Sequence, residues 1–241
     1  MNIFSPIAYE IDYYNCASLE EYQLKTLYLA IDKAWDCLCK EKYDVLKDED
    51  LTTLALQEKL AIIQRDGDVI PGFSYKHYET IDSGIKSKAV KKGKETREYD
   101  LVIRPCGQPP VGLNKPKYGL FIEAKRLIKG GPSLNDYVKD GVLRFIEDGD
   151  YAERMAHALM LGYTDTTFSL PVTFATYITE SKAQCAQKCK NHTKGVMPFT
   201  QNSCVYITIF DRTFIYPNGQ PAPQIALHHL WLHSLRQMLP R

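Results

Sequence analysis

The sequence lacks three features that would place it in a specialised class of proteins. No apolar run approaches the roughly 20 residues that a membrane-spanning helix needs. Its first residues show neither the basic start nor the apolar stretch of a secretory signal, so we expect a cytoplasmic chain without a membrane partner. The formal net charge is only +1, from 30 Lys and Arg against 29 Asp and Glu. Any nucleic-acid surface must therefore come from local clusters of basic residues.

Two common catalytic and binding motifs are also missing. No G-x-S-x-G motif supports a serine hydrolase. Gly130-Gly131-Pro132 lacks the lysine and serine that continue a phosphate-binding P-loop, so any ATPase that works with this protein is expected to be a separate chain. The seven cysteines are odd in number and the chain is long for a disulfide-stapled scaffold, which indicates reduced thiols.

A zinc site is one interpretation of the segment that holds three of these cysteines. Cys185, Cys189, His192 and Cys204 follow the spacing C-x3-C-x2-H-x11-C. Zinc needs four converging ligands, and neither the CxxC nor the HxxxH spacing is present. The spacing therefore leaves zinc open and favours free thiols on a polar surface helix or loop.

Three histidines cluster near the C-terminus, at His228, His229 and His233. Residues 225–232 read as a β-strand, in which neighbouring histidines point to opposite faces. We therefore expect packed or surface histidines here, and no metal-binding pair.

Hydrophobic periodicity predicts alternating groups of helices and strands, typical of an α/β protein with a mixed sheet flanked by helices. No linker marks a boundary, so we expect one domain spanning residues 1–241. A capping box of Ser18 and Glu21 begins the first predicted helix. Helices are predicted at 18–40 and 50–64, and two more within 133–162, the second of them at 151–160. Strands are predicted at 69–80, 99–103, 118–125, 171–179, 204–210 and 225–232.

The chemistry of the chain concentrates at two of the predicted strands. Asp100 opens one strand, and Glu123-Ala124-Lys125 ends the next. Residues two apart in a strand point to the same face, so Glu123 and Lys125 are expected to project together, with Asp100 beside them. Two carboxylates with an amine nearby are suited to a hard cation such as Mg²⁺. Lys125 would orient or deprotonate an attacking water, or stabilise negative charge.

An acid two places before a lysine is common, so the triplet decides nothing alone. A second copy, Glu180-Ser181-Lys182, follows an apolar run at its polar exit, whereas Glu123 lies inside an apolar strand. A salt-bridged strand end remains the structural alternative for Asp100, Glu123 and Lys125.

This pattern resembles the core of the PD-(D/E)xK nucleases, the restriction-endonuclease-like superfamily. Tyr99 stands where the family usually has proline before the aspartate. The resemblance implies a restriction-endonuclease-like mixed sheet flanked by helices, with Mg²⁺, or Mn²⁺ as a substitute, held by Asp100, Glu123 and the Ala124 carbonyl. It also implies an additional acid from the preceding helix. Glu49 is the candidate, with Asp50 and Glu58 as the alternatives.

A softer similarity, to restriction-type nucleases of bacterial defence and mobile-element loci, follows the motif at 141–146, 149–152 and 160–163. It implies an N-terminal helical part at 1–45, a nuclease core at 46–180, and C-terminal strands with a basic segment at 181–241. The implied activity is metal-dependent endonucleolytic cleavage of DNA in restriction or anti-phage defence, by a homodimer or a subunit of a larger complex. The alternative is a non-catalytic subunit that keeps the nuclease fold and binds nucleic acid or a partner. RNA remains a possible substrate.

Basic residues flank both motif strands, as a surface that guides a phosphate backbone requires. The bland alternative is a solvated lysine-rich loop. Arg144 is the most ambiguous of these residues, because on a helix it is also in reach of Asp140 or Glu147. The residues expected to contact nucleic acid are Lys91, Lys92, Lys94, Arg97, Arg126, Lys129 and Arg144.

Overall fold

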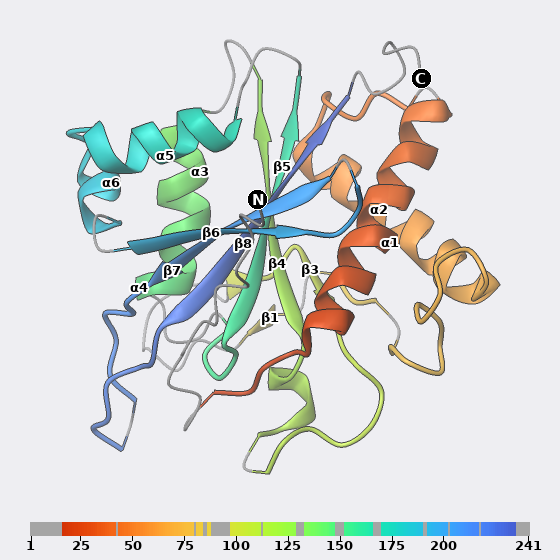
Figure 1. Ribbon diagram of the computed structural model, residues 1–241, viewed down its shortest axis with the longest axis horizontal. Helices are drawn as coiled ribbons and strands as arrows, with labels where there is room; N and C mark the ends of the chain where they lie inside the picture. Colours follow the sequence, from red (N-terminus) through yellow and green to blue (C-terminus); the bar gives the residue numbers. More distant parts are fainter. Residues whose placement is uncertain are drawn as a thin grey trace, which may run out of the picture.

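A mixed six-stranded β-sheet lies between two groups of helices in the computed structural model (Figure 1). The structure describes residues 16–41, 43–79, 81–83, 86–87, 97–111, 113–128, 133–147, 152–165, 170–189, 192–201, 203–216 and 218–234. The helices are α1 (Glu21–Lys40), α2 (Glu49–Asp66), α3 (Leu134–Tyr137), α4 (Leu143–Glu147), α5 (Leu170–Glu180) and α6 (Gln184–Lys188), with a 3-10 turn η2 (Lys115–Lys117) and a π-helical turn η3 (Val138–Val142). The strands are β1 (Lys86–Ser87), β2 (Arg97–Glu98), β3 (Leu101–Ile103), β4 (Leu120–Leu127), β5 (His157–Thr164), β6 (His192–Pro198), β7 (Cys204–Phe210) and β8 (Ile225–His233).

The strand order in the sheet is β3-β4-β5-β8-β7-β6. Strands β4, β5 and β8 run parallel at the centre, while β3 at one edge and β7 and β6 toward the other pair antiparallel with their neighbours. Helices α1 and α2 cover one face, and α3 to α6 cover the other (Figure 1). The predicted α/β class, a mixed sheet with helices on both sides, is confirmed.

Helix α1 packs its apolar stripe on the central strands. Its side chains from Leu24 to Leu38 that fall at helical spacing are buried, and the Trp35 ring stacks on Tyr163 of β5 with centroids 5.3 Å apart. The expected capping box was misplaced by two residues. The helix begins after Glu20, whose backbone N–H donates to the Gln23 side chain, and Ser18 lies outside the helix.

Helix α2 is longer than predicted by one residue at its start and two at its end. The Asp48 side chain accepts a hydrogen bond from the Leu51 N–H and caps the N-terminus. Gly67 ends the helix with φ +66°, a conformation that glycine adopts without strain. The cap at Asp48 fixes the position of Glu49, the first residue of the helix.

Three predicted elements were wrong. Residues 69–79 form turns, with only Tyr78 making an isolated bridge, and 152–160 are not a helix because the buried strand β5 begins at His157. Residues 171–179 belong to helix α5, where Phe174 and Ile178 are buried and four residues apart. Strand β6 was not predicted, whereas the predicted strands at 99–103, 118–125, 204–210 and 225–232 correspond to β3, β4, β7 and β8.

Buried histidines link the sheet to the helices on both faces. His228 and His229 are neighbours on β8: His228 Nδ1 lies 2.6 Å from the Tyr28 hydroxyl of α1, and His229 Nδ1 lies 2.9 Å from the Tyr137 hydroxyl of α3. His157 of β5 extends the first contact, 3.0 Å from His228 and 2.9 Å from the Ser18 hydroxyl. Side-chain hydrogen bonds therefore connect Ser18, His157, His228 and Tyr28 in a row, which we call the histidine chain.

The buried apolar side chains form one contiguous core that extends from Ala17 to Leu232. Across the part of the chain that the structure describes, none of the helices has the length and apolarity to cross a bilayer.

Candidate metal and phosphodiester site

The two motif strands lie side by side. Strand β3 pairs antiparallel with β4, and Leu101 is opposite Ile122. Asp100 precedes Leu101 and Glu123 follows Ile122, so both carboxylates lie at the same end of this ladder. The structure therefore brings together residues that are 23 positions apart in the sequence.

Strand β4 continues beyond β3 to Leu127, and two carboxylates bind the backbone of this extension. The Ala124 N–H donates to Asp100 Oδ2 at 2.6 Å, and the Arg126 N–H donates to Glu49 Oε2 at 2.7 Å. Side-chain oxygens thus take the hydrogen bonds that a longer neighbouring strand would accept. Glu49 is the acid that α2 contributes, while Asp50 and Glu58 are exposed.

Lys125 lies at the centre of this group. Its Nζ is 2.8 Å from Glu123 Oε1, 3.0 Å from Glu49 Oε1 and 2.8 Å from the Ala124 carbonyl oxygen, and its side chain is only 12% exposed. Burial lowers the pKa of Lys125, but Glu123, Asp100 and Glu49 outweigh burial and raise this pKa above its usual value. Lys125 is therefore protonated at neutral pH in this arrangement.

Asp100 shows the opposite response to its surroundings. Burial and the neighbouring Glu123 raise the pKa of Asp100 to about 7, although Lys125 and the Ala124 N–H oppose the shift. The carboxyl group is thus close to half protonated at neutral pH. A cation bound beside it would favour the charged form.

Arg144 also contacts the motif. Its Nη1 lies 2.5 Å from Glu123 Oε1, and Glu123 is fully buried. The alternatives from the sequence, pairing with Asp140 or Glu147 on its own helix, do not describe the observed contact, since Glu147 pairs with Lys188. Arg144 instead reaches across to the sheet.

The other basic residues named from the sequence give a mixed result. The guanidinium of Arg126 donates to the carbonyl oxygens of Leu46 and Lys47, which ties β4 to the turn before α2. Arg97 lies in β2, directly upstream of the motif, and its side chain falls outside the description. Lys91, Lys92, Lys94 and Lys129 lie outside the described residues.

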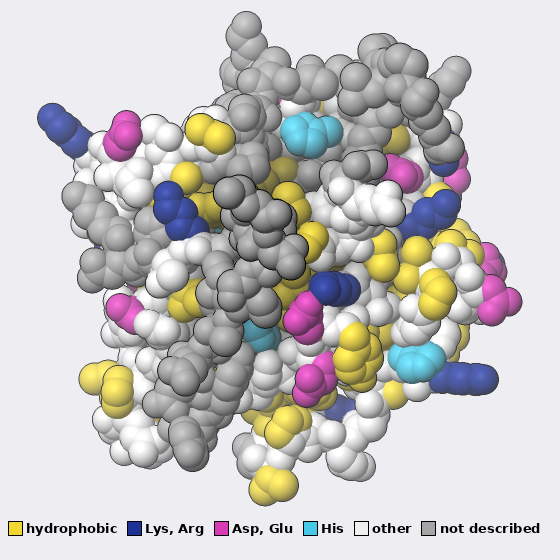
Figure 2. Space-filling model, in the orientation of Figure 1, with side chains coloured by type: hydrophobic (Ala, Val, Ile, Leu, Met, Phe, Trp, Pro, Cys, Tyr) yellow, Lys and Arg dark blue, Asp and Glu magenta, His cyan; other side chains and the backbone are white. Residues whose placement is uncertain are grey.

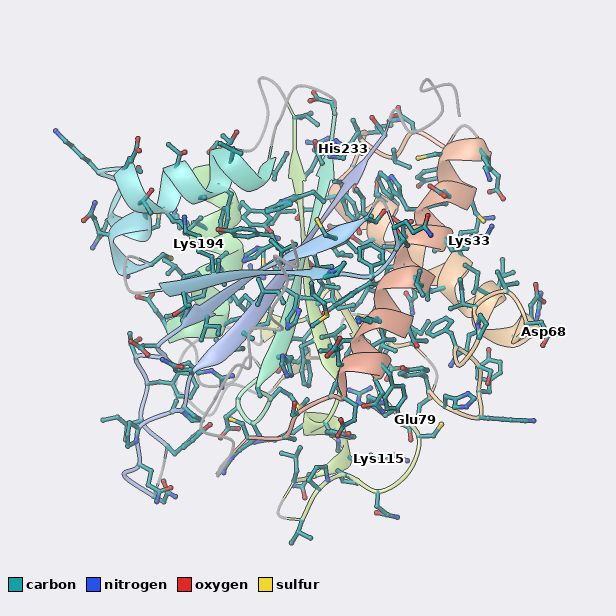
Figure 3. All side chains as sticks on the ribbon, viewed as in Figure 1. Lys33, Asp68, Glu79, Lys115, Lys194 and His233 are labelled. Atoms are coloured by element: carbon teal, nitrogen blue, oxygen red, sulfur yellow. The ribbon has the colours of Figure 1, made fainter. Side chains whose placement is uncertain are left out.

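Two lysines near the motif strands are engaged with acids. Lys117 pairs with Glu153, and Lys115 pairs with Glu79. Figure 3 shows Lys115 next to Glu79, with Lys194 of β6 far from this pair. On the face drawn in Figure 2, the described Lys and Arg side chains are scattered and form no continuous patch. Nucleic-acid contact by basic residues stays a prediction.

The four candidate zinc ligands do not form a group. The Cys185 thiol contacts Asn135 and the Tyr177 hydroxyl, and no disulfide joins the described cysteines. In the β6–β7 ladder His192 is opposite Phe210 while Cys204 is opposite Pro198, so His192 and Cys204 are six positions apart, about 20 Å. The expected surface position of these thiols is wrong for Cys185 and Cys189, which are buried.

Within the described residues, no three His, Cys, Asp or Glu side chains are grouped so as to hold a metal ion by themselves. The donors that meet at Lys125 Nζ are Glu49 Oε1, Glu123 Oε1 and the Ala124 carbonyl, all oxygens of the kind that Mg²⁺ prefers. An ammonium group is already held there, which shows that these oxygens accept a cation. Three carboxylates, Asp100 included, face two cationic side chains, Lys125 and Arg144. One negative charge is left over when all are ionised, and because a cation bound there would favour the ionised form of Asp100, the residues fit a bound cation.

The chain matches no family model, no curated protein and no solved structure. Its function must therefore be argued from the site.

Proposed function

We propose that the protein is a metal-dependent nuclease that hydrolyses phosphodiester bonds in DNA. The observation that carries this proposal is the meeting of Asp100, Glu123, Lys125 and Glu49 at the extension of β4. An acid-led strand beside a Glu-x-Lys strand supports a restriction-endonuclease-like version of the mixed sheet. The second Glu-x-Lys triplet, Glu180-Ser181-Lys182, lies at the end of helix α5 with Glu180 and Lys182 exposed.

Asp100 and Glu123 would hold Mg²⁺ or Mn²⁺ with the Ala124 carbonyl, and Glu49 would serve as an outer or second-ion ligand. When bound, such an ion polarises a phosphate oxygen and lowers the pKa of a bound water. The Ala124 N–H holds Asp100 by one oxygen, Oδ2. Because backbone groups of β4 position these carboxylates, their geometry follows from the sheet and not from a mobile loop.

Lys125 supplies a fixed positive charge at the site. It is protonated, so its role is to donate a hydrogen bond to the attacking water or to the developing oxyanion, and not to remove a proton. Glu49 keeps the amine in place from α2. Removing the charge of Lys125 is therefore expected to slow the chemical step.

The proposed setting is bacterial restriction or anti-phage defence in the cytoplasm, and it comes from the family resemblance. Cleavage of both strands of a duplex needs two sites, so we propose a homodimer or a larger complex, with any ATPase on a separate chain. A specific observation favours the non-catalytic alternative as well: Glu123 Oε1 is bound by two cations, as in a structural ion pair. The protein would then bind nucleic acid or a partner without cutting.

A cleavage assay of supercoiled plasmid with the purified protein, in Mg²⁺, Mn²⁺ or EDTA, distinguishes the nuclease from the non-catalytic binding subunit. We expect metal-dependent nicking that falls by more than about a hundredfold in Glu123→Gln and Lys125→Met. Glu180→Gln and Lys182→Met repeat the same substitutions in the exposed triplet and should match wild type. RNA of the same length is tested alongside.

Wild-type protein that is inert on DNA and RNA with every ion favours the binding-subunit alternative. Full activity in Glu123→Gln would contradict the assignment of the site itself.

A further inference from the structure

Two threonines interrupt the apolar face that α2 packs on the sheet. Thr52 and Thr53 are both buried, although valine would fill the same space without a hydroxyl. A buried hydroxyl costs free energy unless it forms hydrogen bonds, so its partners show what it contributes. Thr52 donates to carbonyl oxygens of the chain just before it, at Val45 and Asp48. Thr53 instead reaches a different element, strand β5.

The Thr53 hydroxyl joins the start of α2 to this strand. It donates to the Glu49 carbonyl oxygen at 2.9 Å and lies 3.0 Å from the Tyr163 hydroxyl. A threonine hydroxyl has one hydrogen, and since that hydrogen goes to Glu49, the Tyr163 hydroxyl is the donor of the second bond. Bonding of a threonine to the carbonyl four residues earlier is common in helices, but it does not account for the link to β5.

Tyr163 and its neighbour on the sheet hold the same turn of α2 from two strands. The Tyr163 ring is fully buried, stacks on Trp35 of α1 and is opposite Arg126 of β4 in the ladder. The Arg126 N–H donates to Glu49 Oε2, and its guanidinium donates to two carbonyl oxygens of the turn before α2. Polar contacts from β4 and β5 therefore converge on the first turn of α2, the turn that carries Glu49.

We propose that Tyr163 and Thr53 are positioning residues, which set the place of Glu49 at the metal site through the first turn of α2. This inference rests on the proposed function, in which Glu49 is the outer or second-ion ligand. Apolar contacts between α2 and the sheet have no preferred direction, whereas a hydrogen bond fixes a distance and an angle. A group that takes part in a metal site must be placed to within about 0.5 Å, and the row from Tyr163 through Thr53 to Glu49 supplies that constraint.

The first test measures the metal ion without DNA. Tyr163→Phe keeps the ring that stacks on Trp35 and removes only the hydroxyl. We expect it to weaken Mn²⁺ binding by about tenfold, measured by calorimetry or electron paramagnetic resonance. Plasmid cleavage should then need more Mn²⁺, with the rate at saturating Mn²⁺ within about twofold of wild type. Thr53→Val should repeat these results, and Thr53→Ser, which keeps the hydroxyl, should bind Mn²⁺ as wild type does.

The second test asks whether the Tyr163 hydroxyl acts through Glu49. In a protein that already carries Glu49→Gln, adding Tyr163→Phe should weaken Mn²⁺ binding no further, because the carboxylate that the hydroxyl positions is gone. An equal weakening with and without the Glu49 carboxylate overturns the inference, since the hydroxyl would then act on the rest of the site.

Gln64→Leu is the matched control on the same helix. Gln64 also anchors α2 by buried hydrogen bonds, to the Tyr78 and Glu79 carbonyl oxygens, but at the end of the helix far from Glu49. Its loss should lower the free energy of unfolding in urea and leave Mn²⁺ affinity unchanged. The same weakening of Mn²⁺ binding in Gln64→Leu as in Tyr163→Phe would overturn the inference, because any loosening of α2 would then be sufficient.

Urea denaturation establishes that each variant is folded, and Thr53→Val carries the comparison if Tyr163→Phe is not. A folded variant of either residue that binds Mn²⁺ within about threefold of wild type overturns the inference. The nuclease proposal survives that result if wild type binds Mn²⁺ and cleaves. Wild type that does neither removes both proposals.

Discussion

The carboxylate cluster beside β4 and the histidine chain between β5 and β8 are both buried groups of polar side chains, but they differ in charge. The histidine chain lies on the central strands and pairs its nitrogens with neutral partners. The carboxylate cluster consists of three acids, Asp100, Glu123 and Glu49, and two cations, Lys125 and Arg144. It lies where β4 extends beyond the end of its shorter neighbour β3. One group is complete in itself, and the other carries an unbalanced charge.

Burial acts on both groups in the same direction, toward the neutral form, with opposite effects on the pKa. It raises the pKa of Asp100 to about 7 and lowers the pKa of His157 to about 4. Neutral histidines satisfy one another, so an added proton destabilises their chain. Under the proposed function, the carboxylate cluster instead gains from an added cation. The comparison therefore separates a neutral group that stabilises the fold from a charged one that we propose binds a metal ion.

Lowering the pH should destabilise the fold through the histidine chain. The folded pKa of His157 is about 4, below the ordinary 6.5, so the unfolded chain takes up a proton between these values that the native state does not. Stability is therefore lost as the pH falls from 6.5 toward 4. In His157→Gln this loss should be about 2 kcal/mol smaller between pH 7 and pH 5, measured by urea denaturation. Parallel curves for the two proteins would show that His157 is protonated in the native state.

Two tyrosine substitutions test how much the hydrogen bonds of the histidine chain contribute to stability. Tyr28→Phe leaves His228 without its hydroxyl partner and should lower the free energy of unfolding by about 1.5 kcal/mol at pH 7. Tyr206→Phe is the matched control, because the Tyr206 hydroxyl is buried and has no hydrogen-bond partner among the described residues. Its removal should be neutral or stabilising. Equal losses in both variants would contradict a specific role for the chain.

The carboxylate cluster should show the opposite pH dependence. The folded pKa of Asp100 lies above its ordinary 3.8, so this group favours the native state at low pH and loses that contribution as the pH rises through 7. Asp100→Asn keeps an oxygen for the Ala124 N–H. Relative to wild type it should gain about 4 kcal/mol of stability between pH 4 and pH 8, by urea denaturation. A destabilised variant at pH 8 would make Asp100 a structural acid.

The sequence predicted the strands around the motif because Gly- and Pro-rich turns bound short apolar runs there. It failed at β5, whose residues are all buried: a strand covered on both faces has no alternation and is easily read as a helix. Helix α5 was read as a strand since Val172, Thr173, Thr176, Ile178 and Thr179 are β-branched, a preference that the burial of Phe174 and Ile178 on one face overrides.

The candidate site was predictable only in part. The same-face rule placed Glu123 with Lys125, but no spacing rule connects Glu49 to Lys125 across 76 residues. The family resemblance named Glu49 as an additional acid, and its ion pair with Lys125 was not predicted. Arg144, which contacts Glu123, follows a π-helical turn that has no signal in periodicity. The strand that carries His228 and His229 was predicted, while their tyrosine partners were not.

The shortness of β3 has a consequence for how such a cluster could arise. Three residues of β3 cover β4 only as far as Ile122. Four more paired residues, opposite Glu123 to Arg126, would cover the Ala124 and Arg126 amides with a neighbouring backbone and leave the acids no N–H group to bind. An edge strand that stops four residues early thus leaves backbone amides that carboxylates can bind, and this small change is enough to place a charged cluster on an otherwise ordinary sheet.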